Sequence, residues 1–382
     1  MRVQGLWKLS SKLLSKTMKK ILCIIGTRPE AIKMAPVVLA LKKEPWINVR
    51  VLATAQHRHM LDQVLNFFNI EPDIDLNIMR PNQALSTLTA RLLLELDDVL
   101  QAEKPDFVLA QGDTTTVMSV ALACFYHHIP FGHVEAGLRT WDMSNPFPEE
   151  ANRVIAGRLA RWHFAPTESS RQNLLREGVN DGDIIVTGNT VIDALLMTAA
   201  RDIELDIELD ESKRLILVTS HRRENFGEPF RNICRALNAL AENNPDIQIL
   251  YPVHPNPNVK DVAYEILSNR SNIILCEPLD YAPFIVAMKR AYFIISDSGG
   301  VQEEAPALGK PVLVLREETE RPEAVEMGVV KLVGPNYQRI VEEAQLLLDD
   351  IEAYRGMARG ISPYGDGKAA ERIVAQLRKH FA

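Results

Sequence analysis

Acidic side chains that could move protons gather in one stretch of the chain, residues 132–153, which reads GHVEAGLRTWDMSNPFPEEANR. Glu135 directly follows a short apolar run at 129–134, which predicts a buried β-strand. Glu149 and Glu150 follow two prolines, where the first turn of a helix is expected to begin. Loops at the ends of buried strands commonly carry chemistry, because the strand is rigid and the loop is open to a ligand. This stretch is therefore the first candidate for an acid–base site.

The two glutamates at the helix start also have a purely structural interpretation. Carboxylates favour the positive end of a helix dipole, an effect worth about 0.3–1 kcal/mol. A helix over 149–159 would place Glu149 and Glu150 there. Glu135 is harder to explain by helix capping because it follows a strand. Glu135 is therefore the strongest single candidate, and both interpretations stay open for the other two.

A second group of residues suits an anion such as a diphosphate. The run 296–304, SDSGGVQEE, joins an expected strand to an expected helix. Ser298 and the two glycines after it would let backbone N–H groups approach an anion at the start of that helix. Glu303 or Glu304, one turn further on, could accept hydrogen bonds from a ribose diol. A plain tight turn explains the same residues, so the case for a ligand depends on the cations that accompany them.

Cationic side chains follow two of the expected strands. His221, followed by two arginines, stands at the end of one strand and suits a diphosphate better than a protein core. Arg28 and Lys33 form a second cationic cluster near the N-terminus, although a solvated helix start explains them as well. Arg321 follows a polar loop and could add a further contact.

Several familiar ligand motifs are absent from the sequence. The phosphate-binding pattern GxxxxGK[ST] does not occur. The only match to the nicotinamide fingerprint, at 365–370, has no expected strand before it. The histidines at 57, 59, 127 and 128 and the four scattered cysteines lack metal-ligand spacing, so we expect reduced thiols and no metal.

The elements expected around these residues alternate between strands and helices. The first half has apolar runs typical of strands at 21–25, 49–54, 107–110, 129–134, 162–165 and 183–187. The stretch 199–214 is rich in acidic residues and has no strand pattern, and we expect a domain boundary within 190–214. The alternation restarts with strands at 215–219, 247–251, 273–275, 292–296, 312–315 and 329–333. This pattern predicts an α/β fold of two Rossmann-like, doubly wound domains that face a central cleft.

Composition limits the class of protein. The 382 residues suffice for two domains with separate cores. The formal net charge of −7 argues against a nucleic-acid partner. No run approaches the roughly 18 apolar residues that span a membrane. Residues 1–17 are basic and weakly amphipathic, which favours an N-terminal extension over a signal peptide, and we expect a cytoplasmic protein.

Ordered motifs make the chain from Met18 onward resemble the non-hydrolysing UDP-N-acetylglucosamine 2-epimerases of bacteria. In the first half they are GTRPEAIKMAP at 26–36, TAQHR at 54–58, GDTTT at 112–116, HVEAGLR at 133–139, PEEANR at 148–153 and GNTVIDAL at 188–195. In the second half they are HRRENFG at 221–227, PVHPNPNV at 252–259, DSGGVQEEAP at 297–306 and TERPEA at 319–324. So many motifs in one order make a chance similarity implausible.

The resemblance implies the two-domain GT-B glycosyltransferase architecture and a homodimer. The first domain would span 18–190, the UDP-binding domain 191–363, and the helix 364–382 would cross back to the first domain. The implied reaction is the reversible conversion of UDP-GlcNAc to UDP-ManNAc without NAD, metal or another cofactor. It would proceed by anti-elimination of UDP to 2-acetamidoglucal and syn re-addition, and would feed cell-surface polysaccharide synthesis. A hydrolysing epimerase and a GT-B glycosyltransferase remain alternatives.

The resemblance also implies roles for single residues. The implied catalytic residues are Asp113, Glu135, Glu149 and His221. The implied substrate-binding residues are Arg28, Lys33, Arg139, Phe284, Ser298, Gly299, Gly300, Glu304 and Arg321. The sequence does not decide which carboxylate acts on which face of the sugar. Gln111 stands where some relatives have histidine, and His59 stands where some have a glutamine that helps to bind a second, regulatory substrate molecule.

Overall fold

A computed structural model describes residues 18–54, 58–78, 80 and 83–382, and in it the chain forms two compact units. Unit 1 contains the described residues up to Ala194 together with Gly367–Ala382, and unit 2 is Leu195–Asp366. The boundaries expected from the sequence, 190/191 and 363/364, fall a few residues earlier. The extension 1–17, Gln56 and the side chain of His59 lie outside the described residues.

Unit 1 is built on a seven-stranded parallel sheet in the order β3-β2-β1-β4-β5-β6-β7. Its strands are β1 (Lys19–Ile25), β2 (Ile47–Ala53), β3 (Ile74–Asp75), β4 (Phe107–Gln111), β5 (Phe131–Val134), β6 (Trp162–Ala165) and β7 (Ile184–Val186). Its helices are α2 (Arg28–Lys42), α3 (Arg58–Phe67), α4 (Leu85–Glu103), α5 (Thr115–Tyr126), α6 (Glu149–Leu159), α7 (Glu168–Arg176) and α16 (Ala369–Phe381). The helix α8 (Thr190–Ala199) leads from unit 1 into unit 2.

Unit 2 is built on a six-stranded parallel sheet in the order β10-β9-β8-β11-β12-β13. Its strands are β8 (Arg214–Thr219), β9 (Ile247–Pro252), β10 (Ile273–Cys276), β11 (Phe293–Ser296), β12 (Val312–Val314) and β13 (Val330–Leu332). Its helices are α9 (Glu228–Asn243), α10 (Pro257–Leu267), α11 (Tyr281–Arg290), α12 (Gly299–Glu304), α13 (Pro322–Glu326), α14 (Tyr337–Asp349) and α15 (Ile351–Met357).

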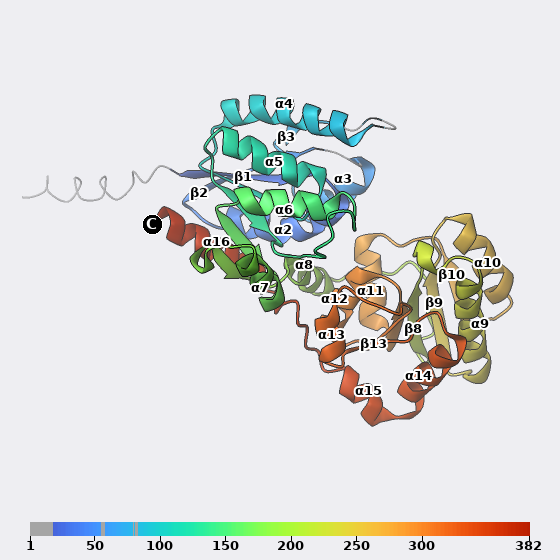
Figure 1. The fold of residues 1–382 in the computed structure, drawn as a ribbon. Coiled ribbons are helices and arrows are strands. Elements are labelled where there is room, and N and C mark those ends of the chain that lie inside the picture. Colours follow the sequence, from blue (N-terminus) through green and yellow to red (C-terminus); the bar gives the residue numbers. More distant parts are fainter. Residues whose placement is uncertain (1–17, 55–57, 79, 81–82) are drawn as a thin grey trace, which may run out of the picture. The chain divides into compact units, whose positions relative to one another are not determined.

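Helices cover both faces of the unit 1 sheet, with α4 and α5 on one side and α2 and α16 on the other (Figure 1). Leucines at 88, 92, 96 and 100 form one stripe along α4 and pack with Leu22 and Ile24 of β1. A spacing of four keeps these side chains on one helix face. The core strands are covered on both faces, which is why they are continuous apolar runs in the sequence.

The prediction of two doubly wound α/β domains is confirmed. The sequence analysis predicted no helix at α8, α10, α13, α14 or α15. The sequence predicts a domain boundary within 190–214, and the first ten residues of this segment form α8 and bury Val191, Ile192 and Leu195. Apart from Asp193, the acidic residues of this segment follow the end of that helix. Within the part of the chain that the structure describes, no helix is both long and apolar enough to cross a membrane.

The strand order decides where the polar loops collect. In unit 1 the direction of winding reverses between β1 and β4, and in unit 2 between β8 and β11. Parallel strands end at the same edge of a sheet, and ligands bind beside such a reversal in open α/β sheets. The loops after β1 and β4 carry Thr27 and Asp113, and those after β8 and β11 carry His221 and Ser298. Each unit therefore has one edge suited to a ligand.

Candidate functional site

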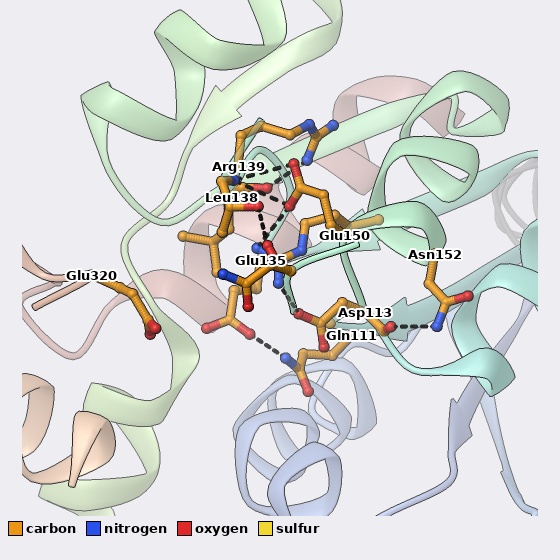
Figure 2. Close-up of polar contacts among 12 residues, drawn as sticks. Gln111, Asp113, Glu135, Leu138, Arg139, Glu150, Asn152 and Glu320 are labelled. Atoms are coloured by element: carbon orange, nitrogen blue, oxygen red, sulfur yellow. Dashed lines mark hydrogen bonds and ion pairs between the residues drawn. The ribbon is translucent and has the colours of Figure 1, made fainter. Parts of the chain in front are cut away.

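Glu135 is the most constrained carboxylate at the unit 1 edge. It follows the last residue of β5 and has a φ of 64°, a left-handed conformation uncommon for a residue with a side chain. Lys33 Nζ donates to its Oε1 at 2.6 Å and Asn189 Nδ2 donates to the same oxygen at 2.8 Å. Gln111 Nε2 donates to its Oε2, as Figure 2 shows. The carboxylate is thus held by donors from three different segments.

Asp113 lies in the loop that joins β4 to α5. Its Oδ2 is 2.9 Å from Arg153 Nη2, and its backbone carbonyl accepts a hydrogen bond of 2.9 Å from Asn152 Nδ2 (Figure 2). Burial raises the pKa of the Asp113 carboxyl above its ordinary value, while Arg153 acts in the opposite direction. The negative charges of Glu135 and Glu149 raise it further. Asp113 and Glu149 therefore lie within electrostatic reach of each other.

Two charged residues that the sequence singled out support the loop between β5 and α6. Glu150 is buried, accepts the backbone N–H groups of Thr140 and Trp141 at 3.0–3.1 Å, and lies 3.5 Å from Arg153. Glu150 at the start of α6 therefore has a structural role, because it holds the backbone of this loop. Arg139 donates to both carboxylate oxygens of Glu177, at 2.7 and 2.9 Å, and its side chain is 0% exposed.

The loop after β1 begins α2 with a capping box. The Thr27 side chain accepts the N–H of Glu30, and Glu30 Oε2 accepts the N–H groups of Gly26 and Thr27. A Cβ at Gly26 would lie 2.9–3.0 Å from side-chain oxygens of Thr116, Glu30 and Thr54, so only glycine fits there. Arg28 occupies the first residue of α2 and is half-buried.

His133 on β5 holds the Asp113 loop through a hydrogen bond to its backbone. Its Nε2 lies 2.7 Å from the carbonyl oxygen of Gly112, the residue before Asp113. Burial lowers the pKa of His133 to about 3, so the ring is neutral at physiological pH. Because a carbonyl can only accept, the Nε2 position must carry the proton and donate it.

The unit 2 edge is organised by Asp297, which is 0% exposed. Its Oδ2 accepts four hydrogen bonds of 2.9–3.1 Å, from the Ser220 hydroxyl, the N–H groups of His221 and Arg222, and the Asn225 amide. His221 Nδ1 lies 3.7 Å from the other oxygen of Asp297, and its ring stacks on that of His254. Burial lowers the pKa of His221, and Asp297 opposes that effect. Asp297 thus fixes the whole His221 loop.

Arg321 covers the glycine turn at the start of α12. A Cβ at Gly299 would lie 2.8 Å from the Arg321 guanidinium, so the glycine permits this close approach. Glu303 Oε1 accepts from Arg321 Nε at 2.6 Å and orients it. Ser298 precedes this turn, Gly300 is exposed, and Glu304 is buried one turn further on. Phe284 is half-buried on α11.

The structure brings several of the expected residues together within each unit. Asp113, Glu135 and Lys33 meet in unit 1, and Gly299 meets Arg321 in unit 2. Arg139 is directed to Glu177 instead. Sequence reasoning gave no role to Gln111, Asn189, Arg153 or Asp297, although Gln111 directly precedes a motif noted in the sequence and each of the other three lies within one. The partners described above lie 24–77 positions away for Gln111, Asn189 and Asp297 and 40 positions away for the Arg153–Asp113 pair, so spacing carried no signal.

Metal ligation has no support among the described residues, which contain no group of three or more His, Cys, Asp or Glu side chains placed to hold an ion. Three cysteines are buried and burial raises their pKa.

Comparison with known proteins gives a consistent result. Residues 39–378 match the family model described as UDP-N-acetylglucosamine 2-epimerase. A Yersinia pestis protein of that name is 55% identical over 94% of this chain and 99% of its own length. The crystal structure of UDP-GlcNAc 2-epimerase from Neisseria meningitidis, bound to UDP-GlcNAc, is 50% identical, covers 94% of this chain and 100% of that one, and has a TM-score of 0.84. The Methanocaldococcus jannaschii enzyme in complex with UDP-GlcNAc and UDP is 36% identical over 94% of this chain and 99% of that one, with a TM-score of 0.77.

Proposed function

The chain belongs to the UDP-N-acetylglucosamine 2-epimerase family, and on that premise we propose that it interconverts UDP-GlcNAc and UDP-ManNAc without net hydrolysis. The protein is an isomerase of two-domain α/β architecture. The N. meningitidis relative binds UDP-GlcNAc in its crystal structure, which supports the same substrate for this chain.

The proposed reaction inverts C2 by elimination and re-addition. A base removes the proton at C2, the C2–H electron pair forms the C1=C2 double bond, and the C1–O bond breaks as UDP leaves with its electron pair. UDP then adds back to C1 of the 2-acetamidoglucal, and an acid delivers a proton to C2 from the other face. The anti-elimination and syn re-addition need one acid–base group on each face of the sugar.

Unit 1 supplies the acid–base groups in this proposal. Asp113, Glu135 and Glu149 are the candidates, and the first two are supported by contacts that fix their carboxylates. Burial raises the pKa of Asp113, and a raised pKa makes a carboxyl a better proton donor than an ordinary aspartate. Lys33 lies beside Glu135 and balances the negative charge of this edge.

Unit 2 supplies the nucleotide site in this proposal. His221, the backbone N–H groups of Gly299 and Gly300, and the Arg321 guanidinium would stabilise the negative charge of UDP as it leaves. Glu304 would accept hydrogen bonds from the ribose.

The other residues expected to bind substrate differ in how accessible they are. Arg28 of unit 1 and Ser298 and Phe284 of unit 2 are only partly buried and open to a ligand. Arg139 would have to leave Glu177 first.

One observation carries the proposal: Asp113 and Glu135 lie in the loops that follow the neighbouring strands β4 and β5, with a cation beside each of them, Arg153 at 2.9 Å and Lys33 at 2.6 Å. A protein that only binds a nucleotide sugar needs no such pair of carboxylates. A hydrolysing epimerase would share this pair of carboxylates, so the reaction product decides between the hydrolysing and the non-hydrolysing reaction.

Proton NMR of the protein incubated with UDP-GlcNAc in heavy water tests the proposal. We expect UDP-ManNAc, with deuterium at C2 of both epimers. Release of UDP and free ManNAc as the main products would instead establish the hydrolysing reaction. Unchanged substrate without an acceptor would point to a glycosyltransferase, and epimerisation with full retention of the original hydrogen would exclude the elimination.

We also propose that the enzyme acts as a cytoplasmic homodimer and provides UDP-ManNAc for cell-surface polysaccharide. Light scattering coupled to gel filtration tests the dimer directly. A particle of the monomer mass, 42.9 kDa, at working concentration would contradict it.

A further inference from the structure

Glu135 is surrounded by donors that the reaction itself does not require. Lys33 and Asn189 both donate to Oε1, at 2.6 and 2.8 Å, and Gln111 donates to Oε2. We call Lys33, Asn189 and Gln111 the Glu135 donor set. They come from α2, from the loop before α8 and from the end of β4, so three separate segments each supply a donor to one carboxylate.

The two amides are aimed at Glu135 by their own surroundings. Asn189 is 3% exposed, and its Oδ1 accepts the backbone N–H of Val191 at 3.1 Å, which leaves Nδ2 directed at the carboxylate. Gln111 is 4% exposed at the buried end of β4. Neither amide can titrate, so each donates an N–H to Glu135 at every pH.

The charged neighbours act on Glu135 in opposite directions. Lys33 from α2 favours the ionised carboxylate, whereas Asp113 from the loop after β4 opposes a second negative charge nearby. His133, two residues earlier on β5, is neutral because burial lowers its pKa to about 3. A donor that hydrogen-bonds only the charged form of a carboxylate stabilises that form. The two amides therefore add to the effect of Lys33.

We propose that Gln111 and Asn189 are positioning residues that keep Glu135 ionised and fixed in direction, so that Glu135 starts the reaction as the base that takes the C2 proton. The proposal rests on the proposed epimerase function and goes beyond it, because it assigns a starting protonation state to one of the carboxylates. Glu135 accepts the proton as the C2–H bond breaks and returns it in the reverse direction.

The pH profile of C2 deprotonation tests the proposal. The rate of deuterium entry at C2 falls at low pH as the base becomes protonated, which gives an acidic limb. Asn189→Asp keeps the acceptor for Val191 but replaces the donor by a second carboxylate, and Gln111→Leu removes the other donor. We expect each change to move the acidic limb to higher pH by about one unit or more, while much of the rate returns above the new limb.

Two further variants serve as controls. Gln111→His retains a ring N–H that can donate, and we expect its acidic limb to lie close to that of the wild type. Asn66→Asp makes the same change of charge at an exposed position of α3 and should leave the profile unchanged. If Asn189→Asp impairs folding through the α8 start, the Gln111 pair still decides the question.

An acidic limb that stays in place in Asn189→Asp and Gln111→Leu would overturn the proposal, even if the rate falls equally at every pH, because a structural role alone gives that result. The proposed function has a separate readout. Free ManNAc as the wild-type product would refute the non-hydrolysing reaction, whereas deuterium entry at C2 would still report the state of Glu135.

Discussion

Buried carboxyl groups at the unit 1 edge differ in how their charge is compensated. Glu135 has a lysine and two amides, and Asp113 has Arg153. Glu30, which closes the capping box of α2, accepts the backbone N–H groups of Gly26 and Thr27 and a hydrogen bond from the Thr114 side chain, and is 2% exposed. Burial raises the pKa of Glu30 to about 7, with the nearby Asp113 adding to the effect and the hydrogen bonds opposing it. Glu30 is therefore a carboxyl whose charge destabilises the folded state.

Glu30→Gln should remove a pH-dependent loss of stability. Below about pH 4.5 Glu30 is protonated in both the folded and the unfolded state. Between pH 4.5 and about 7 only the unfolded chain releases the proton, so the free energy of unfolding falls as pH rises, and above pH 7 the loss is constant. A glutamine can still accept in the capping box. We expect the difference in free energy of unfolding, variant minus wild type, to increase by about 1–3 kcal/mol from pH 5 to pH 8.

Thermal unfolding of both proteins at pH 5 and pH 8 measures this gain. The variant's unfolding temperature should exceed that of the wild type by more at pH 8 than at pH 5. An equal difference at the two pH values would mean that Glu30 is ionised in the folded protein.

At the residue scale, sequence could predict a functional carboxylate only where local context carries the signal. Glu135 follows an apolar run that predicts a buried strand, and its place at the strand end is visible without any partner. Asn189 and Asp297 act through residues 54 and 72–77 positions away, so only the folded chain reveals what they hold. Arg139 shows the reverse case, because its type and position suggested a ligand while its partner is Glu177.

Among the elements, the C-terminal helix α16 makes polar contacts with the rest of unit 1 near both of its ends. Asp193 of α8 accepts the N–H groups of Ala369 and Ala370, at 3.2 and 2.9 Å, and this carboxylate is buried. Near the other end Arg378 contacts Glu44, but the Arg378 side chain is 63% exposed. Helix starts need acceptors for their free N–H groups, so the buried contact should matter more than the exposed ion pair.

Asp193→Ala should lower the free energy of unfolding by about 1–3 kcal/mol, because it leaves two buried N–H groups without this charged acceptor. Arg378→Ala, on the same helix, should cost no more than about 1 kcal/mol, as is usual for an exposed ion pair. Chemical denaturation followed by circular dichroism measures both. Equal losses in the two variants would contradict this order, because the buried acceptor would then contribute no more than the exposed ion pair.

Most elements were predictable because their apolar periodicity is strong. β1, β4, β6 and β8 are continuous buried runs, and β6 has the bounds that the sequence predicted. α8 was not predicted because its apolar residues directly precede the acidic stretch 199–214, and only a domain boundary was expected within 190–214. The short β3 pairs with β2 through only two residues, which is too little for a periodic signal.

For the whole molecule, the proposed roles divide between two units with separate cores. Unit 1 holds the carboxylates, whereas unit 2 holds the glycine turn, Arg321 and the Asp297-supported His221 loop. Each unit has its own buried sheet, so a substitution at one edge should leave the other edge folded. Binding of UDP and turnover of the sugar should therefore respond to different substitutions.

Calorimetric titration with UDP, combined with turnover measurements, tests this division. Asp113→Asn, Glu135→Gln and Glu149→Gln should each lower the rate by a factor of about a hundred or more, as expected for loss of an acid or base, and leave UDP affinity within a few-fold. Glu304→Gln should weaken UDP binding by about 1–3 kcal/mol, the usual value for a lost charged hydrogen-bond partner. Glu326→Gln, an exposed change of the same kind on α13, is the matched control and should alter neither. A unit 1 variant with intact turnover would remove that residue from the acid–base set, and a collapse of UDP affinity in the unit 1 variants would move the nucleotide site to the first unit.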